Sequence, residues 1–241
     1  MNMEEIKITS RNHLEAGSEA EGSQRILCST RGKSLICSMI EKRSDTNGEI
    51  EGRIADILVN SFTRRPALQE GPLVSICNFM NNAIFVKNKP GSVYMCDAAI
   101  MMLIKSHFRW IISGTSRVLY FVDKKLVHQS EKKEHTRIGM EPTYTPNMSE
   151  VYKVEKGENA FFLCSKALTD KIGEDGIEKA LQEASSQDDW MRRVEEMAGD
   201  IDFAAQALIL PEQKRPPILS FAIIGILLIA VVVLSILLVI K

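Results

Sequence analysis

One stretch of the sequence, Asn159-Ala-Phe-Phe-Leu-Cys-Ser-Lys-Ala-Leu-Thr-Asp170, organises the rest of the predicted fold. Its first half is a short apolar run, residues 160–164, which is typical of a buried β-strand. A small residue and a turn follow, and a helical pattern begins at Glu174. The pattern predicts a buried strand that delivers a side chain to the edge of a sheet, immediately before Lys166.

Strand and helix patterns are segregated in blocks on both sides of this stretch. Two apolar runs around Arg31-Gly32-Lys33 predict a hairpin, and Pro90-Gly91 predicts a break after two helices. The predicted strands are residues 5–9, 25–30, 34–39, 93–104, 108–113, 117–122, 125–129, 150–154, 160–164 and 204–210. The predicted helices are residues 47–62, 68–85, 174–184 and 188–197. Segregated blocks favour an α+β layered domain over a parallel doubly wound sheet.

The composition is that of an ordinary globular protein. The 241 residues include 30 basic and 31 acidic residues, for a formal net charge of -1. No basic stripe emerges, so nucleic acid is not an expected partner. None of the five cysteines forms a Cys-x-x-Cys pair, and the four histidines have no metal-binding spacing. Unpaired cysteines in apolar contexts indicate reduced core thiols in the cytosol.

The C-terminal part of the sequence differs from the rest. Residues 218–240 are 23 consecutive residues without a charge, long enough as a helix, at about 35 Å, to cross a bilayer core of about 30 Å. We expect a cell-membrane protein with three parts: a domain over residues 1–210, a Pro-rich basic spacer over 211–217, and a single-pass tail anchor over 218–240. Lys214 and Arg215 precede the span, which predicts that the bulk of the chain is cytoplasmic.

Four stretches, in order, resemble motifs of the metal-dependent Ser/Thr protein phosphatases, the PPM or type 2C family. Ile111-Ile-Ser-Gly-Thr-Ser-Arg-Val-Leu-Tyr120 is similar to the family's Val-Gly-Asp-Ser-Arg-x-Tyr, and Glu131-Lys-Lys-Glu-His-Thr136 to its Thr-x-Asp-His-Ser. Leu163-Cys-Ser-Lys-Ala-Leu-Thr-Asp170 resembles Leu-Cys-Ser-Asp-Gly-Leu-Thr-Asp, and Gly199-Asp-Ile-Asp-Phe203 resembles Gly-Ser-x-Asp-Asn. The resemblance covers roughly residues 4–210 and implies a PPM-like layered β-sandwich flanked by helices.

The departures from the family's motifs fall on its metal site. PPM enzymes hold two divalent metals in a cluster of carboxylates, and two close cations need several anionic oxygens. By the resemblance, Ser38 or a neighbour, Thr115 and Lys166 stand where the family has Asp, while Asp202 is the one retained family carboxylate. These four residues define a degenerate site without catalytic residues.

Lys166 is the largest change at this site. At an effective dielectric near 20, a unit charge about 4 Å from another is worth about 4 kcal/mol, and roughly double against a dication. We therefore expect no metal cofactor, and we predict that Lys166 pairs with Asp202. The alternative is that Lys166 points into solvent from a turn. Arg117 could grip a phosphate, or its role could be structural.

These observations predict a membrane-tethered pseudophosphatase. It would bind a kinase, a phosphoprotein or another regulator in phospho-signalling. One alternative is a divergent but active Ser/Thr protein phosphatase that uses Mn²⁺ or Mg²⁺. A second is a structural tail-anchored membrane component.

Overall fold

The computed structural model describes residues 8–13, 24–42, 50–90 and 93–211. A compact unit of the chain ends at Pro211. The predicted spacer beyond Pro211 and the predicted membrane span, residues 218–240, lie outside the described residues. Within the described ranges, no helix combines the length and the apolar character that a membrane crossing requires.

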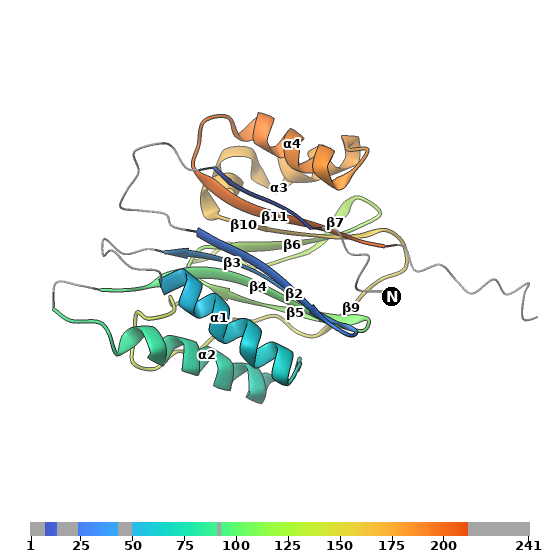
Figure 1. Cartoon of the computed structure of the whole chain (residues 1–241). Helices are drawn as coiled ribbons and strands as arrows, with labels where there is room; N and C mark the ends of the chain where they lie inside the picture. The colour runs from blue at the N-terminus through green and yellow to red at the C-terminus, as the bar shows by residue number, and fades with distance from the viewer. Residues whose placement is uncertain (1–7, 14–23, 43–49, 91–92, 212–241) are drawn as a thin grey trace, which may run out of the picture. The chain divides into compact units, whose positions relative to one another are not determined.

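Two antiparallel sheets form the middle of the domain (Figure 1). The strands are β1 Ile8–His13, β2 Gln24–Arg31, β3 Ser34–Lys42, β4 Cys96–Ile104, β5 His107–Ser113, β6 Arg117–Val122, β7 Lys125–Gln129, β8 Asn147–Met148, β9 Tyr152–Lys153, β10 Asn159–Cys164 and β11 Phe203–Leu210. One sheet has the order β1-β11-β10-β6-β7, and the other the order β2-β3-β4-β5-β8 with β9 also paired to β5. The stretch that begins at Asn159 therefore supplies the central strand of the five-stranded sheet.

Helices cover the outer face of each sheet. They are α1 Ile50–Arg64, α2 Glu70–Phe85, α3 Lys166–Glu183 and α4 Gln187–Ala198. Side chains of α1 and α2 pack on β3 and β4, and side chains of α3 and α4 pack on β10 and β11. The described domain is thus a β-sandwich between two helical layers, and the predicted α+β layered fold is confirmed.

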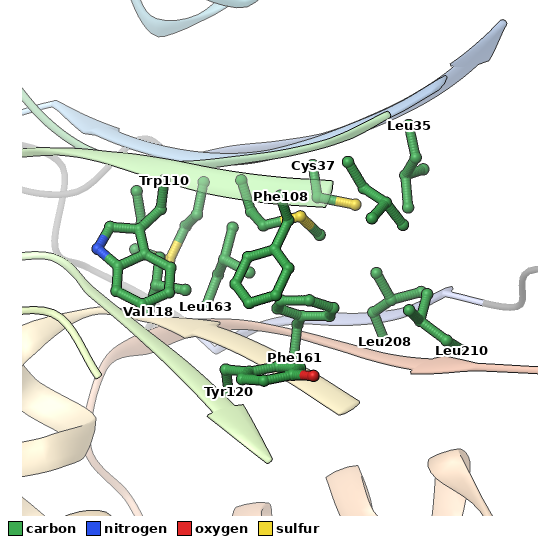
Figure 2. Packing of buried hydrophobic residues seen from close by; sticks show 14 of the residues in the cluster. Leu35, Cys37, Phe108, Trp110, Val118, Tyr120, Phe161, Leu163, Leu208 and Leu210 are labelled. Atoms are coloured by element: carbon green, nitrogen blue, oxygen red, sulfur yellow. The ribbon is translucent and has the colours of Figure 1, made fainter. Parts of the chain in front are cut away.

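The core between the sheets follows from the two-residue period of the strands. In β3, Leu35, Cys37 and Met39 face the opposite sheet, while Ile36 and Ile40 face the helices. Figure 2 shows the inner side chains of both sheets meeting in one layer, which includes a cluster of aromatic rings. Strands such as β3 and β10 are buried at every position, because their sheets are covered on both faces.

Helix α3 begins eight residues earlier than predicted. The backbone at Gly173 is not helical (φ 68°, ψ 169°), so two helical segments meet at a kink within α3. Only the second segment, from Glu174, has the apolar spacing that the sequence pattern revealed. The first segment begins at Lys166, directly after β10, and places its polar side chains at the end of the sandwich.

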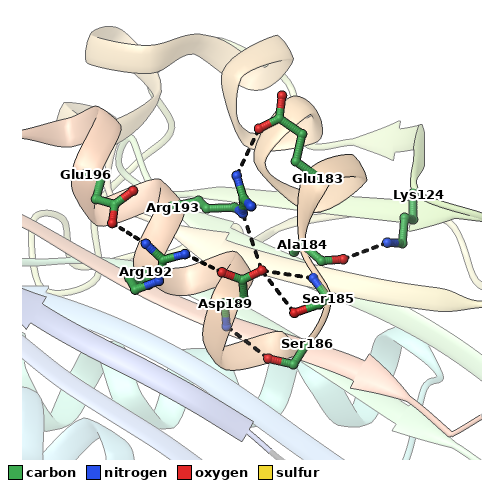
Figure 3. A network of polar contacts seen from close by, with 9 residues as sticks. All are labelled: Lys124, Glu183, Ala184, Ser185, Ser186, Asp189, Arg192, Arg193 and Glu196. Carbon is green, nitrogen blue, oxygen red and sulfur yellow. Dashed lines mark hydrogen bonds and ion pairs between the residues drawn. The ribbon is translucent and has the colours of Figure 1, made fainter.

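Helix α4 begins with a capping network, shown in Figure 3. Ser186 Oγ accepts the Asp189 backbone N–H at 3.1 Å, and Asp189 Oδ2 accepts the Ser185 backbone N–H at 2.9 Å. The hydrogen bond from Ser185 and those from Arg192 and Arg193 hold the pKa of Asp189 well below its ordinary value. Carboxylates are also favoured in the first turn of a helix by the helix dipole.

Replacing Ser186 with alanine is expected to lower the free energy of unfolding by about 1 kcal/mol, because the Asp189 N–H loses its acceptor. Ser185→Ala is the matched control: the Ser185 backbone N–H remains, so its effect should be smaller. Urea unfolding of the full chain in a neutral detergent, followed by tryptophan fluorescence, measures both, since Trp110 and Trp190 are buried in the domain. Equal effects would contradict the assignment of the cap.

Candidate functional site

The candidate site lies at one end of the sandwich. The turn between β5 and β6 crosses from one sheet to the other there, and β4 begins beside it because Ala98 pairs with Ser113. In the other sheet, Cys164 at the end of β10 pairs with Arg117 and with Ala205. Strand ends from both sheets therefore meet, and we call this end of the domain the site end.

A cleft of about 180 Å³ opens at the site end. It is formed by the β5–β6 turn, the start of β6, the segment after β7 and the first half of α3. Its lining residues are Thr115, Arg117, Lys132, Lys133, Glu134, Lys166, Thr169, Asp170 and Glu174. Four cations and two hydroxyls thus share one concave surface with three carboxylates. Such a mixed lining suits a small anionic group that can replace a carboxylate.

Arg117 is held rigidly at the base of the cleft. Its Nη2 lies 3.3 Å from Glu174 Oε1, and the two side chains are only 5% and 11% exposed. Its Nη1 donates to the backbone carbonyl of Glu131. Lys132 Nζ lies 2.5 Å from the other carboxylate oxygen of Glu174. Burial by itself raises the pKa of Glu174, but the Lys132 hydrogen bond and the positive charges of Lys132 and Arg117 outweigh it, and the pKa is lowered.

The rim of the cleft is more loosely held. Lys132 and Lys166 are 64% and 54% exposed, and Lys166 pairs with Asp170 one turn further along α3. Exposed ion pairs of this kind contribute at most about 1 kcal/mol to stability. Lys166 can therefore exchange its partner at little cost.

A buried carboxylate that the sequence interpretation missed lies behind the cleft. Asp97 is fully buried in β4; it accepts Arg137 Nε at 2.7 Å and Thr115 Oγ1 at 3.0 Å. Glu41 of β3 pairs in register with Asp97, so both side chains leave the sheet on the same face. A charged residue inside an apolar strand pattern is the signal that could have identified Asp97, because an acidic residue is almost never fully buried unless it is paired.

The structure brings together three of the five predicted site residues. Thr115, Arg117 and Lys166 line the cleft. Asp202 is half-buried immediately before β11 and is not among the lining residues. Ser38 is fully buried in the middle of β3, opposite Ile100, and its hydroxyl has no hydrogen-bond partner among the described residues.

Two details of the predicted site differ in the structure. Lys166 forms its ion pair with Asp170 on its own helix, and not the predicted pair with Asp202. Lys166 is exposed, as in the alternative interpretation, but it begins a helix and does not lie in a turn. At the site end, β3 ends with Glu41 and Lys42, three and four residues beyond Ser38.

The described residues do not by themselves supply the ligands of a two-metal centre. No three His, Cys, Asp or Glu side chains in the described ranges converge on one point. A pair of divalent cations needs several oxygen ligands, and two nearby carboxylates already have cationic partners: Asp97 pairs with Arg137 and Asp170 with Lys166.

Comparison with known proteins gives no sequence-level match and a clear structural one. No protein-family model and no curated protein matches the chain. The Streptococcus agalactiae serine/threonine phosphatase is similar in structure, with a TM-score of 0.67 at 12% identity over 86% of this chain and 99% of that chain. Serine/threonine phosphatase Stp1 from Staphylococcus aureus gives 0.68 at 12% identity over 86% of this chain and 95% of that chain.

A third comparison corrects the prediction that no cofactor is expected. The catalytic domain of the serine/threonine protein phosphatase PstP, in complex with two manganese ions, gives a TM-score of 0.67 at 14% identity, over 85% of this chain and 97% of that chain. That structure points to manganese or magnesium dependence for this fold, so the expectation of a metal-independent domain is wrong.

The likeness to these three structures covers 85–86% of this chain. At 12–14% identity it establishes the fold and nothing finer. The chain therefore has the fold of the PPM-family Ser/Thr protein phosphatases.

Proposed function

We propose that the cleft binds the phosphate group of a phosphorylated serine or threonine in a partner protein. The domain would then act as a pseudophosphatase, a phosphatase-like binding domain for a phosphoprotein or a kinase in phospho-signalling. One observation carries the proposal: four cations, Arg117, Lys132, Lys133 and Lys166, line a single cleft. The two hydroxyls of the cleft already donate their protons within the domain, Thr115 to Asp97 and Thr169 to the Lys166 carbonyl, so the cations are the groups that would hold the phosphate.

The strength of the ion pairs decides whether a phosphate can enter. A phosphorylated side chain carries about -1.5 to -2 charges at pH 7, and hydrogen bonds to charged groups contribute about 1.5–3 kcal/mol. The exposed pair of Lys166 with Asp170 is worth at most about 1 kcal/mol. A phosphate can therefore displace Asp170 from Lys166 while the buried pair of Arg117 with Glu174 stays in place.

Binding is favoured over hydrolysis by the position of Lys166. By the resemblance, the residue after Ser165 is a metal-binding carboxylate in the PPM family, and here it is a lysine. Lys166 offers a cation to the phosphate and no ligand to a metal. An active Mn²⁺- or Mg²⁺-dependent phosphatase is the second candidate, and the manganese-bound PstP structure favours it.

The location of the protein is also a proposal. The uncharged run of residues 218–240 supports a single-pass anchor in the cell membrane, with the domain in the cytoplasm. Full-length protein should remain with the membrane fraction after extraction with alkaline carbonate. Release into the soluble fraction would contradict the tether without affecting the proposed function of the cleft.

Lys166→Ala is expected to weaken binding of a phosphothreonine peptide about ten-fold, because one charge-assisted contact is lost. Asp170→Asn should have the opposite effect and strengthen binding a few-fold, since it removes the carboxylate that competes for Lys166. Fluorescence anisotropy of the labelled peptide with the full chain in a neutral detergent measures both. Lys179→Ala, an exposed lysine elsewhere on α3, is the matched control.

Two outcomes would contradict the proposal. Equal affinity for the phosphorylated and unphosphorylated peptides would exclude recognition of the phosphate. Release of inorganic phosphate from the peptide with Mn²⁺, abolished by Asp202→Ala, would favour the active phosphatase over the binding domain.

A further inference from the structure

The opposite end of the sandwich carries a second charged surface. Three segments meet there through backbone contacts: the β2–β3 turn, the β4–β5 turn and β9. The Lys105 N–H donates to the Lys33 carbonyl at 2.7 Å, and His107 pairs with Lys153. The α1–α2 connection joins them, because residues 66–69 line one groove with Lys105 and His107. Five of the exposed cations of these segments form what we call the basic face; they are Arg31, Lys33, Arg65, Lys105 and Lys153.

The charges of the basic face are not neutralised within the domain. In the described part of the chain, none of its five cations forms an ion pair, whereas Arg117, Lys132, Lys133 and Lys166 in the cleft are all paired. The segments that build the face, residues 30–34, 64–70, 104–107 and 151–156, contain seven Lys or Arg residues and two Glu residues. Over the whole chain, basic and acidic residues are almost equal in number, so this concentration is local.

The basic face lies at the end of the sandwich where β11, the last strand of the domain, ends. Strand β11 ends at Leu210, which pairs with Asn159 at the far end of the sandwich from the cleft. Figure 1 shows the end of β11 on the same side as the β2–β3 turn and β9. Beyond Pro211, the spacer over residues 211–217 can extend at most about 25 Å before the uncharged run of 218–240 begins.

We propose that the basic face docks on a membrane surface of anionic phospholipids. This inference rests on the proposed tether and goes beyond it, because it also orients the domain: the basic face meets the headgroups and the cleft points toward the cytoplasm. Each Lys or Arg near an anionic surface strengthens binding about five-fold, and the attraction extends over about 8 Å at physiological salt. The groove beside Lys105 adds a partly exposed apolar side chain, that of Val151.

Depth-dependent fluorescence quenching in nanodiscs tests the orientation with the full chain. A fluorophore is placed at Gln69→Cys, an exposed groove residue whose side chain makes no capping hydrogen bond, or at Met140→Cys, an exposed control at the site end. Both variants carry Cys28→Ser, since the other four cysteines are buried. The discs contain nitroxide-labelled lipid in neutral phosphatidylcholine, with or without phosphatidylglycerol.

The probe at Gln69→Cys is expected to be quenched about three-fold more strongly in anionic than in neutral discs, while the probe at Met140→Cys changes little. The difference should disappear near 1 M salt, where the Debye length is about 3 Å. Charge reversal of Lys33, Lys105 and Lys153 to Glu should abolish it. The same reversal at Lys87, Lys171 and Lys179, three exposed lysines elsewhere, keeps the net charge matched and should preserve it.

The possible outcomes distinguish a failure of the docking surface from a failure of the proposed membrane tether. Failure of the chain to enter neutral discs would contradict the tether. Entry with equal quenching in neutral and anionic discs would overturn the docking surface alone. A Gln69→Cys probe that responds to poly-glutamate but not to anionic lipid would also overturn it, in favour of an acidic protein partner.

Discussion

Replacing Glu174 with alanine is expected to lower the free energy of unfolding by about 3–5 kcal/mol, because the substitution leaves a buried guanidinium without its partner. Arg117 is 5% exposed at the base of the cleft, and its Nη2 has Glu174 as its partner. A charge this deeply buried cannot be solvated in compensation. Urea unfolding of the full chain in a neutral detergent, followed by tryptophan fluorescence, measures the loss.

Two further variants show whether the loss comes from the unpaired charge. Lys132→Met removes the exposed partner of Glu174 and should cost at most about 1 kcal/mol. The double variant Arg117→Met with Glu174→Leu removes both buried charges, so its cost should be well below the sum of the single variants. Additive costs would contradict the assignment of a buried ion pair.

The contribution of Glu174 to the free energy of unfolding depends on pH, and the direction of its pKa shift fixes the sign of that dependence. The pKa of Glu174 is lowered from its ordinary value of 4.5 in the folded protein. A lowered pKa means that the carboxylate contributes stability above its unfolded pKa, and that this contribution is lost as the pH falls through the folded value. The difference between the wild type and Glu174→Ala should therefore be largest near neutral pH and shrink progressively below pH 4.5.

Local patterns were sufficient to predict the layers of the fold but not every boundary. Each described sheet strand and helix overlaps a predicted one, apart from the two-residue β8, because apolar periods of 2 and 3.6 record which face of an element is buried. The start of α3 was missed because its first segment, before Gly173, has mostly polar residues and no apolar stripe. In that segment the ion pair of Lys166 with Asp170 is visible only as an i,i+4 spacing, which is a weak signal.

The candidate site shows the limit of sequence interpretation more sharply. Motif resemblance identified Thr115, Arg117 and Lys166, which lie close to the paired ends of β6 and β10, where Arg117 pairs with Cys164. The predicted strand ended at Met39, which put Ser38 near the strand end. In the structure β3 pairs with β4 as far as Lys42, because the partner strand is long enough to continue the ladder. Asp97 was overlooked because its burial depends on Arg137, 40 residues away in the sequence.

Gly114→Ala is expected to be the most damaging small substitution in the domain, at about 4 kcal/mol or more. The residue has φ +64°, a conformation that costs an L-residue about 1–2 kcal/mol. An added Cβ would also lie 1.7 Å from Asp97 Oδ1. Relief of that overlap would move a fully buried carboxylate away from Arg137 and Thr115, which adds the penalty of a broken buried pair.

Gly32→Ala is the control that separates the cost of the backbone conformation from the cost of the overlap with Asp97. Gly32 has φ +57°, but an added Cβ would meet nothing within 4 Å, so its cost should be the backbone term alone, about 1–2 kcal/mol. Adding Asp97→Ala to Gly114→Ala removes the overlapping atoms, so the double variant should lose less stability than the two single variants together. Thermal unfolding of the full chain in a neutral detergent measures all four variants. If Gly114→Ala and Gly32→Ala were equally destabilising, Asp97 would not be the obstacle, and the turn between β5 and β6 would owe its glycine to backbone conformation alone.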